Sequence, residues 1–271
     1  MMITVTPIGP AIGAEISNID LRVTPNRALA EQLNSALLTH HVLVIRNQTL
    51  DPIQYRNALS VFGPPMLQHR AEFNLDECPQ VSRVINREGF PPAVNWHTDH
   101  TNHEKPPKLT ALYGVEIPSH GGDTAFANMV AAYRSLPLDE QTRLRGMFTL
   151  NSMEPDPSYS DSDRSRYPGG IRHPMVRIHP ETEQPSLYFH VSKSQGIEGM
   201  PSADVRPYLE SLLERTIHPD FTYRHAWQRG DVVICDNRCT MHRVHADYQE
   251  QDLRLLWRII IEGDRPAGPA I

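Results

Sequence analysis

The stretch Asp231-Val-Val-Ile-Cys-Asp-Asn-Arg-Cys-Thr-Met-His242 contains the pattern on which the fold prediction depends. Its first part, Asp231 to Cys235, is a short apolar run that predicts a buried strand. Asp236-Asn237-Arg238 then interrupts the apolar run, as a turn does between two strands. Short apolar runs bounded by Pro, Gly and Asp recur along the chain, which favours a fold built from sheets.

The remainder of the chain extends this pattern. Its 24 prolines disfavour long helices and favour short strands joined by turns. Helices are expected after Thr24-Pro25, from Asp51-Pro52 to about Phe62, and from near Pro207. Strands are expected over residues 41–46, 109–115, 123–128, 175–178, 186–191, 221–226, 231–235 and 253–262. With helices concentrated in the first third, the sequence predicts a mainly β fold with flanking helices, a double sheet of the jelly-roll type.

The 271 residues are expected to form one domain, 1–271, because jelly rolls and barrels of this length are often undivided. The segment 153–172 is rich in Ser, Asp, Pro, Arg and Gly and has almost no apolar periodicity. A loop of this length in a compact domain is commonly functional or disordered. We interpret it as a lid over an active site, and an inert insertion is the alternative.

Charge and composition restrict the partners. Lys and Arg number 26 against 32 acidic residues, which gives a net charge of −6. The chain contains no basic stretch of the kind that binds nucleic acids. The chain shows neither a targeting signal nor an apolar run long enough to span a membrane. The three cysteines form no disulfide framework, which favours a reducing compartment. We therefore expect a soluble cytoplasmic protein with a small-molecule ligand, and a homo-oligomer is left open.

Three residues are candidates for a metal site. His97 and Asp99 are two positions apart, so their side chains project to one side if residues 94–99 are extended. An isolated His-x-Asp pair is usually just two polar side chains at the protein surface. Here, however, His242 follows another strand, and both segments could belong to one sheet layer. Two histidines and one carboxylate leave about half of the positions of an octahedral iron open, as in non-haem Fe(II) oxygenases and unlike closed zinc sites.

Two arginines near the C-terminus need anionic partners. Arg254 and Arg258 share one face of the expected strand with Leu256 and Ile260. A buried guanidinium without a partner is costly, so each arginine requires a carboxylate or a sulfonate-like group. The anions could be acidic side chains of the protein or could belong to a ligand.

Together these motifs resemble the taurine dioxygenase (TauD/TfdA) family of Fe(II)- and 2-oxoglutarate-dependent dioxygenases. The resemblance covers most of the chain. It rests on Asn95-Trp96-His97-Thr98-Asp99, Gly121-Gly122-Asp123-Thr124, Asp236-Asn237-Arg238 with His242, and Arg254-Leu-Leu-Trp-Arg258. It implies a double-stranded β-helix, the jelly-roll form of this family.

The resemblance also implies roles for individual residues. His97, Asp99 and His242 would hold Fe(II), and Thr124 and Arg254 would hold the far carboxylate of 2-oxoglutarate. Arg258 matches the position that meets the acidic head of the substrate in several members. The implied reaction is the oxidation, most commonly hydroxylation, of a small acidic substrate by O2, with release of succinate and CO2.

The surroundings of the expected site depart from the taurine-specific pattern. Ala93 stands where an Asn precedes the metal motif, and His100 replaces a small apolar residue, which argues against taurine itself. The candidate pocket residues are His69, His100, Tyr188 and His190. The substrate classes left open are sulfonates, alkyl sulfates, aryloxy acids and amino-acid derivatives, and desaturation, epoxidation or cyclisation could replace hydroxylation. The alternative functions are a Zn- or Mn-dependent hydrolase or isomerase and a non-catalytic small-molecule-binding protein.

Overall fold

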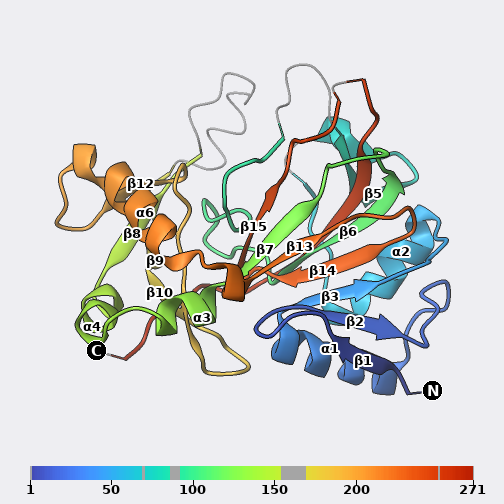
Figure 1. The fold of residues 1–271 in the computed structure, drawn as a ribbon, viewed down its shortest axis with the longest axis horizontal. Helices are drawn as coiled ribbons and strands as arrows, with labels where there is room; N and C mark the ends of the chain where they lie inside the picture. Colours follow the sequence, from blue (N-terminus) through green and yellow to red (C-terminus); the bar gives the residue numbers. More distant parts are fainter. Residues whose placement is uncertain (1, 69–70, 86–91, 154–168, 250, 271) are drawn as a thin grey trace.

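Strands dominate the computed structural model, which describes residues 2–68, 71–85, 92–153, 169–249 and 251–270. The largest sheet lies on the side of the molecule that carries the N-terminus (Figure 1). It is antiparallel except where β2 pairs with β3. In spatial order its strands are β1 (Thr4–Pro7), β2 (Ala14–Ser17), β3 (Val42–Ile45), β14 (Val232–Asp236), β6 (Leu109–Glu116), β16 (Leu255–Ile261), β5 (Cys78–Ile85) and β4 (Asn74–Leu75).

The second layer of the core is a three-stranded antiparallel sheet. Its strands are, in order, β13 (Thr222–His225), β7 (Thr124–Asn128) and β15 (Thr240–Val244). The alternation of β3 shows how the layers pack, since successive side chains of a strand point to opposite faces. Val42 and Val44 pack in one cluster with Phe126 of β7, whereas Leu43 and Ile45 pack on the other face, with the helices. The expected mainly β jelly roll is confirmed.

Two helices cover the outer face of the large sheet. They are α1 (Arg27–His40) and α2 (Pro52–Leu59), and the 3-10 turn η1 (Ser60–Phe62) continues α2. The side chain of Asn26 accepts a hydrogen bond from Leu29 N at 3.0 Å, so α1 begins just after the expected Thr24-Pro25. Asp51 and Gln54 form a reciprocal capping box, which confirms the predicted start of α2.

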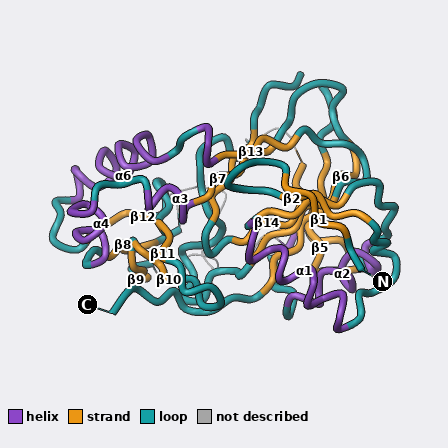
Figure 2. The backbone as a smooth tube through the Cα atoms, turned by 60° about the horizontal axis from the view of Figure 1, so that its bottom comes forward, coloured by secondary structure: helices purple, strands orange, loops and turns teal. Residues whose placement is uncertain are grey.

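The opposite end of the molecule contains smaller elements around a separate apolar cluster (Figure 2). One sheet consists of β12 (Ser194–Ile197), β8 (Phe148–Asn151) and β9 (Ile171–Pro174), and another pairs β10 (Val176–Ile178) with β11 (Pro185–Leu187). The helices here are α3 (Met129–Arg134), α4 (Leu138–Arg145) and α6 (Ser202–Thr216), and short 3-10 turns elsewhere are η2 (Ala71–Phe73) and η3 (Pro219–Phe221). No helix in the described part of the chain is both long and apolar enough to cross a membrane.

Three expectations about the elements need correction. Helix α6 begins at Ser202 and contains Pro207, because Val205 and Leu209 bury one continuous face on both sides of the proline. Helices α3 and α4 lie outside the first third of the chain. The predicted loop 153–172 ends too late, since residues 171 and 172 belong to β9, where the Arg172 guanidinium lies 3.3 Å from the centre of the Phe148 ring. Residues 154–168 lie outside the described part, so the lid and the single-domain division 1–271 stay predictions.

The turn between β14 and β15 connects the two layers of the core. Strand β14 ends at Asp236 in the large sheet, and β15 begins at Thr240 in the three-stranded sheet. His242 therefore lies in the smaller sheet, apart from the apolar strand that precedes it. We expected the segment around His97 and the strand that precedes His242 to belong to one sheet layer. His97 does pair with His242, through an isolated bridge, but the preceding strand β14 belongs to the other sheet.

Candidate active site

The three candidate metal ligands meet between the sheets. The backbones of His97 and His242 exchange hydrogen bonds of 3.0 and 2.7 Å, and the centres of their rings lie 4.3 Å apart. Asp99 Oδ2 lies 4.0 Å from His242 Nε2. One potential ligand atom from each residue lies within 4.8 Å of the others. The predicted convergence is thus present, although residues 94–99 form a bridge at His97 and not a continuous strand.

The protonation states of these residues suit a divalent cation. Burial, with the neighbouring His97, lowers the pKa of His242 to about 3, so its imidazole is neutral at pH 7. Burial alone would raise the pKa of Asp99, but His242, which is itself protonated in the acidic range where Asp99 titrates, together with Arg258 and His100 keeps that pKa well below its usual range. His97 Nδ1 lies 2.8 Å from Asn95 O; if it donates to that carbonyl, the lone pair is on Nε2. These two imidazoles and one carboxylate are ligands that Fe(II) accepts.

Arg254 and Thr124 contact one another, as expected from their motifs. Arg254 Nε donates to Gly122 O at 2.8 Å, and Nη2 donates to Thr124 Oγ1 at 3.3 Å. Gly122 has a φ of +73°, and a Cβ there would lie 3.1 Å from Arg254 Cδ. A side chain at this position would therefore be strained and would crowd the arginine. Burial lowers the pKa of Arg254, which remains a cation at neutral pH.

Trp227 is a member of this arrangement that the sequence did not predict. Its indole Nε1 donates to Thr124 Oγ1 at 3.0 Å. Thr124 Oγ1 thus accepts two hydrogen bonds, and its own proton is directed elsewhere. The contact depends on the pairing of β13 with β7, in which His225 lies opposite Thr124, so no local sequence signal marks Trp227.

Arg258 has a different environment from Arg254. Its Nη2 donates to Gln68 Oε1 at 2.6 Å, and its Nε is buried without a hydrogen-bond partner among the described residues. Its positive charge is among the causes that lower the pKa of Asp99, which places it near that candidate ligand. The two arginines therefore have separate partners. His69, one of the expected pocket residues, lies outside the described part of the chain and stays a prediction.

The other expected pocket residues take different positions. The His190 ring lies 5.8 Å from the His97 ring, and burial holds its pKa well below the usual value. His100 has a φ of +52°, and it is among the groups that lower the pKa of Asp99. Tyr188 lies beyond the end of β11, where the Arg177 guanidinium is 5.1 Å from its ring centre, and burial raises its pKa to about 12. Tyr188 and His190 thus lie past the strand on which we expected them.

A second buried group of ionisable residues lies in and around the β14–β15 turn, and we call it the Asp236 cluster. Asp236 accepts hydrogen bonds from Arg238 Nε at 2.8 Å and Nη2 at 2.6 Å, and its Oδ2 lies 3.1 Å from His179 Nε2. Burial would raise the pKa of Asp236, but the hydrogen bonds from Arg238 hold it well below its usual range. Glu181 binds Arg238 Nη1 at 2.5 Å, and Cys239 Sγ lies next to the carboxylate. The cluster is an internal ion-pair network.

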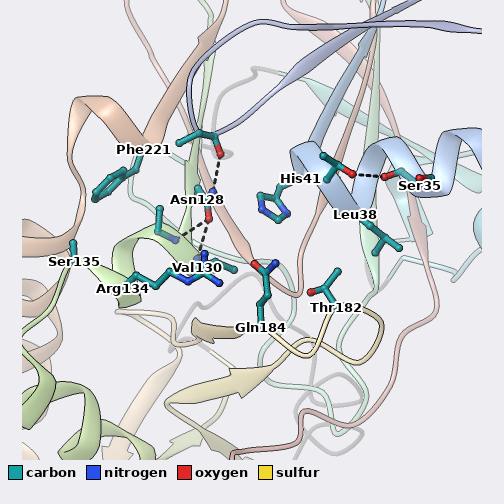
Figure 3. A pocket seen from close by; sticks show the side chains of 13 residues that line it. Ser35, Leu38, His41, Asn128, Val130, Arg134, Ser135, Thr182, Gln184 and Phe221 are labelled. Carbon is teal, nitrogen blue, oxygen red and sulfur yellow. Dashed lines mark hydrogen bonds between the residues drawn. The ribbon is translucent and has the colours of Figure 1, made fainter.

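A cavity of about 770 Å³ lies between α1 and α3. Figure 3 shows His41 at its wall, together with Asn128 at the start of α3 and Gln184. His41 Nδ1 lies 3.3 Å from Cys239 Sγ, which links the cavity wall to the Asp236 cluster. The described residues that line the cavity include none of the candidate metal ligands.

Comparisons with known proteins agree with the site. Residues 4–260 match the family described as taurine catabolism dioxygenase TauD, TfdA family. The chain is 31% identical to the alpha-ketoglutarate-dependent 2,4-dichlorophenoxyacetate dioxygenase of Cupriavidus pinatubonensis, over 90% of this chain and 92% of that protein. It is also 31% identical to the alpha-ketoglutarate-dependent sulfate ester dioxygenase of Pseudomonas putida, with coverage of 97% and 91%. A solved taurine dioxygenase from Burkholderia xenovorans has a TM-score of 0.86 and 32% identity, with coverage of 98% and 91%.

Proposed function

This chain belongs to the TauD, TfdA family of taurine catabolism dioxygenases, and from that premise we propose how its residues divide the reaction. The protein is a 2-oxoglutarate-dependent dioxygenase that uses Fe(II), 2-oxoglutarate and O2. It oxidises a small organic substrate and releases succinate and CO2. The observation that carries the division of roles is the meeting of His97, Asp99 and His242 between the sheets.

We assign the binding of Fe(II) to these three residues. When bound, Fe(II) with 2-oxoglutarate and O2 supplies the oxidising power that breaks a C–H bond of the substrate. The protein contributes three ligand atoms that are already close together, and those of Asp99 and His242 are deprotonated at neutral pH. Burial of Asp99 and His242 keeps bulk water away from the reacting groups.

Arg254 and Thr124 are assigned to the far carboxylate of 2-oxoglutarate. Thr124 accepts from both Arg254 and Trp227, so its hydroxyl proton is available to an incoming carboxylate. A guanidinium and a hydroxyl donor side by side suit such a group. Thr124 shares a face of β7 with Phe126, whose ring lies 6.1 Å from the His242 ring, so the carboxylate site adjoins the metal ligands.

Arg258 is assigned to the anionic group of the substrate. Its buried Nε lacks a partner among described residues, and its charge already acts on Asp99. An anion placed there would complete the hydrogen bonding of the guanidinium. The names of the relatives support this, since 2,4-dichlorophenoxyacetate and sulfate esters both carry an anionic group. We assign His100 and His190 to the pocket wall, with His69 and Tyr188 as further candidates.

The expectations about partners and location complete the proposal. We propose that the enzyme acts in the cytoplasm on free small molecules, and not on nucleic acids or membranes. Its net charge of −6 and its three free, buried cysteines support this. Neither a Zn- or Mn-dependent hydrolase nor a passive binding protein explains why Arg254 and Thr124 are arranged for a carboxylate.

Succinate formation tests the proposal. The purified protein is incubated with Fe(II), ascorbate and 2-oxoglutarate, and aryloxyacetates and alkyl sulfates are added, each beside its neutral ester or alcohol analogue. We expect succinate in every reaction and a faster release with the anionic compounds. An absence of succinate would exclude the dioxygenase reaction. Equal acceleration by charged and neutral analogues would refute the role of Arg258.

A further inference from the structure

We propose that Thr110 and Asn237 form a positioning relay that fixes the carboxylate of Asp99 for metal binding. The inference rests on the proposed function, because it concerns the metal ligand Asp99. It adds two residues that do not touch the metal or the substrate. They act through hydrogen bonds on the one anionic ligand of the site.

The relay is a continuous chain of buried hydrogen bonds. Thr110 Oγ1, on β6 of the large sheet, donates a hydrogen bond to Asp99 Oδ2. Asn237 Nδ2, in the β14–β15 turn, donates to Thr110 Oγ1 at 2.8 Å. The exposed fractions are 1% for Thr110, 1% for Asn237 and 7% for Asp99. Because water barely reaches these atoms, each donor and acceptor depends on its protein partner.

The chemistry of the three groups fixes the direction of the relay. A carboxylate that binds a metal is deprotonated and can only accept, so the Thr110 hydroxyl must donate to Asp99. Having used its single proton there, Thr110 Oγ1 can only accept from Asn237, and the Asn237 amide must present its NH2 group. With the amide turned over, its oxygen would face an oxygen that has no proton to share. The hydrogen bonds thus run from Asn237 through Thr110 to Asp99.

Asn237 is itself held by its backbone. Its N–H donates to Lys108 O at 3.0 Å, and its carbonyl accepts from Thr98 Oγ1 at 2.9 Å. Thr98 directly precedes Asp99, and Lys108 directly precedes β6. Asn237 therefore connects the turn that leads to His242 with the segment that carries Asp99. The ion pair of Asp236 with Arg238 keeps this turn in place.

The hydrogen bond from Thr110 restrains the orientation of the Asp99 carboxylate. A carboxylate on a side chain can rotate, and metal sites commonly restrain their ligands through hydrogen bonds from neighbouring residues. Here one oxygen of Asp99 is engaged by Thr110, which limits how the carboxylate can turn toward a cation. Without the hydroxyl, the carboxylate would be less well oriented and its desolvation uncompensated.

The test measures binding of Co(II) by the metal-free protein, using visible absorption, beside urea unfolding of the same metal-free samples. Thr110→Val keeps the shape of the side chain and removes the hydroxyl, while Thr110→Ser keeps the hydroxyl. Thr101→Val is the matched control, because Thr101 is equally buried and its hydroxyl has no hydrogen-bond partner in the described structure. Asn237→Ala removes the other half of the relay.

We expect Thr110→Val to weaken Co(II) binding by about 10- to 100-fold, the usual effect of losing a residue that supports a ligand. Thr110→Ser should restore the affinity, and Thr101→Val should leave it unchanged. Asn237→Ala should weaken binding in the parent protein and have a much smaller effect beside Thr110→Val, since it acts through Thr110.

Three outcomes would contradict the relay. The first is an unchanged Co(II) affinity in Thr110→Val, and the second is a loss in Thr110→Ser as large as in Thr110→Val. The third is full additivity of Thr110→Val and Asn237→Ala. Should Thr110→Val not fold, the two other variants still test the proposal. Thr110→Ser must keep the Co(II) affinity, and Asn237→Ala must lose it. Failure of the parent protein to bind Co(II) would instead refute the metal site on which the inference rests.

Discussion

Among the described residues, two groups of histidine and carboxylate side chains have a spacing that suits a metal, and they differ in what surrounds the carboxylate. One is His97, Asp99 and His242, and the other is His179, Asp236 and Cys239. In the Asp236 cluster, Arg238 binds the carboxylate through two nitrogens, and His179 contacts it as well. The negative charge is already paired inside the protein.

Asp99 has no such partner. Its described hydrogen bond comes from the neutral hydroxyl of Thr110, and His242 Nδ1 has no partner in the described part of the chain. The cations that lower its pKa act by their field. Residue types and spacing alone therefore do not define a metal site. A carboxylate must also be free of an internal cation, because a bound arginine occupies the same acceptor positions as a metal.

The largest expected effect comes from removing the charge of the Asp99 carboxylate. Asp99→Asn should weaken Co(II) binding by more than about 100-fold, beyond the effect of residues that only support a ligand, because the site loses its single negative charge. Succinate formation from 2-oxoglutarate should fall with it. Titration with Co(II) and the succinate assay measure the two losses.

Asp236→Asn is the matched control, with the same substitution at a similarly buried carboxylate. It breaks the fully buried pair with Arg238 while Glu181 still binds Arg238 Nη1, so the free energy of unfolding of the metal-free protein should fall by about 3 kcal/mol, the lower end of the cost of breaking a buried ion pair. Asp99→Asn should destabilise the metal-free protein less. An Asp236→Asn protein as stable as the parent would contradict the structural role of Asp236. An Asp99→Asn protein that still binds Co(II) with the parent affinity would contradict the metal-binding role of Asp99.

An intermediate effect is expected from the two arginines. Arg254→Gln should raise the KM for 2-oxoglutarate by about 10- to 100-fold, the cost of one charge-assisted contact, with little change in the KM for the substrate. Arg258→Gln should show the opposite pattern with an anionic substrate found by the succinate screen. Each variant is the control for the other. Similar changes in both KM values for both variants would show that the arginines do not have separate ligands.

The smallest effect concerns pH and the wall of the cavity in Figure 3. Burial lowers the pKa of His41 from 6.5 to about 4, so between these values the unfolded chain binds more protons than the folded protein. The stability of the parent protein must therefore fall as the pH falls from 6.5 to 4, by about 1 kcal/mol per pH unit for this histidine.

His41→Asn should remove this contribution, and Asn tolerates the left-handed φ of +63° at this position. Urea unfolding of metal-free protein between pH 4 and 7 gives the slope of stability against pH. His173, whose pKa burial also lowers to about 4, is expected to keep part of the slope in the variant. A slope as steep in His41→Asn as in the parent would contradict the assignment.

The sequence predicted those features that depend on local patterns. The apolar spacing of α1, the Asp51-Pro52 start of α2 and the apolar runs of β3, β6 and β14 all led to correct elements. The structure brings the three candidate metal ligands together, and Arg254 contacts Thr124, as the motifs implied. Strand β1 was missed because all four of its residues are exposed, so it has no apolar alternation.

Other features depend on pairing between distant strands, which one sequence does not show. Asn237 and Thr110 are 127 positions apart, and the Asp236-Asn237-Arg238 motif was recognised without its partners. Trp227 reaches Thr124 only because β13 lies beside β7. Tyr188 and His190 were expected on one strand, but β11 ends at Leu187, before both.

Anomalous diffraction from crystals of the protein soaked in Co(II) would test the central claim most directly, because it locates every bound cobalt. The account predicts one strong peak between His97, Asp99 and His242, at about 2.0–2.2 Å from the ligand atoms, and none at the Asp236 cluster. A peak between His179, Asp236 and Cys239, or no peak beside Asp99, would contradict it.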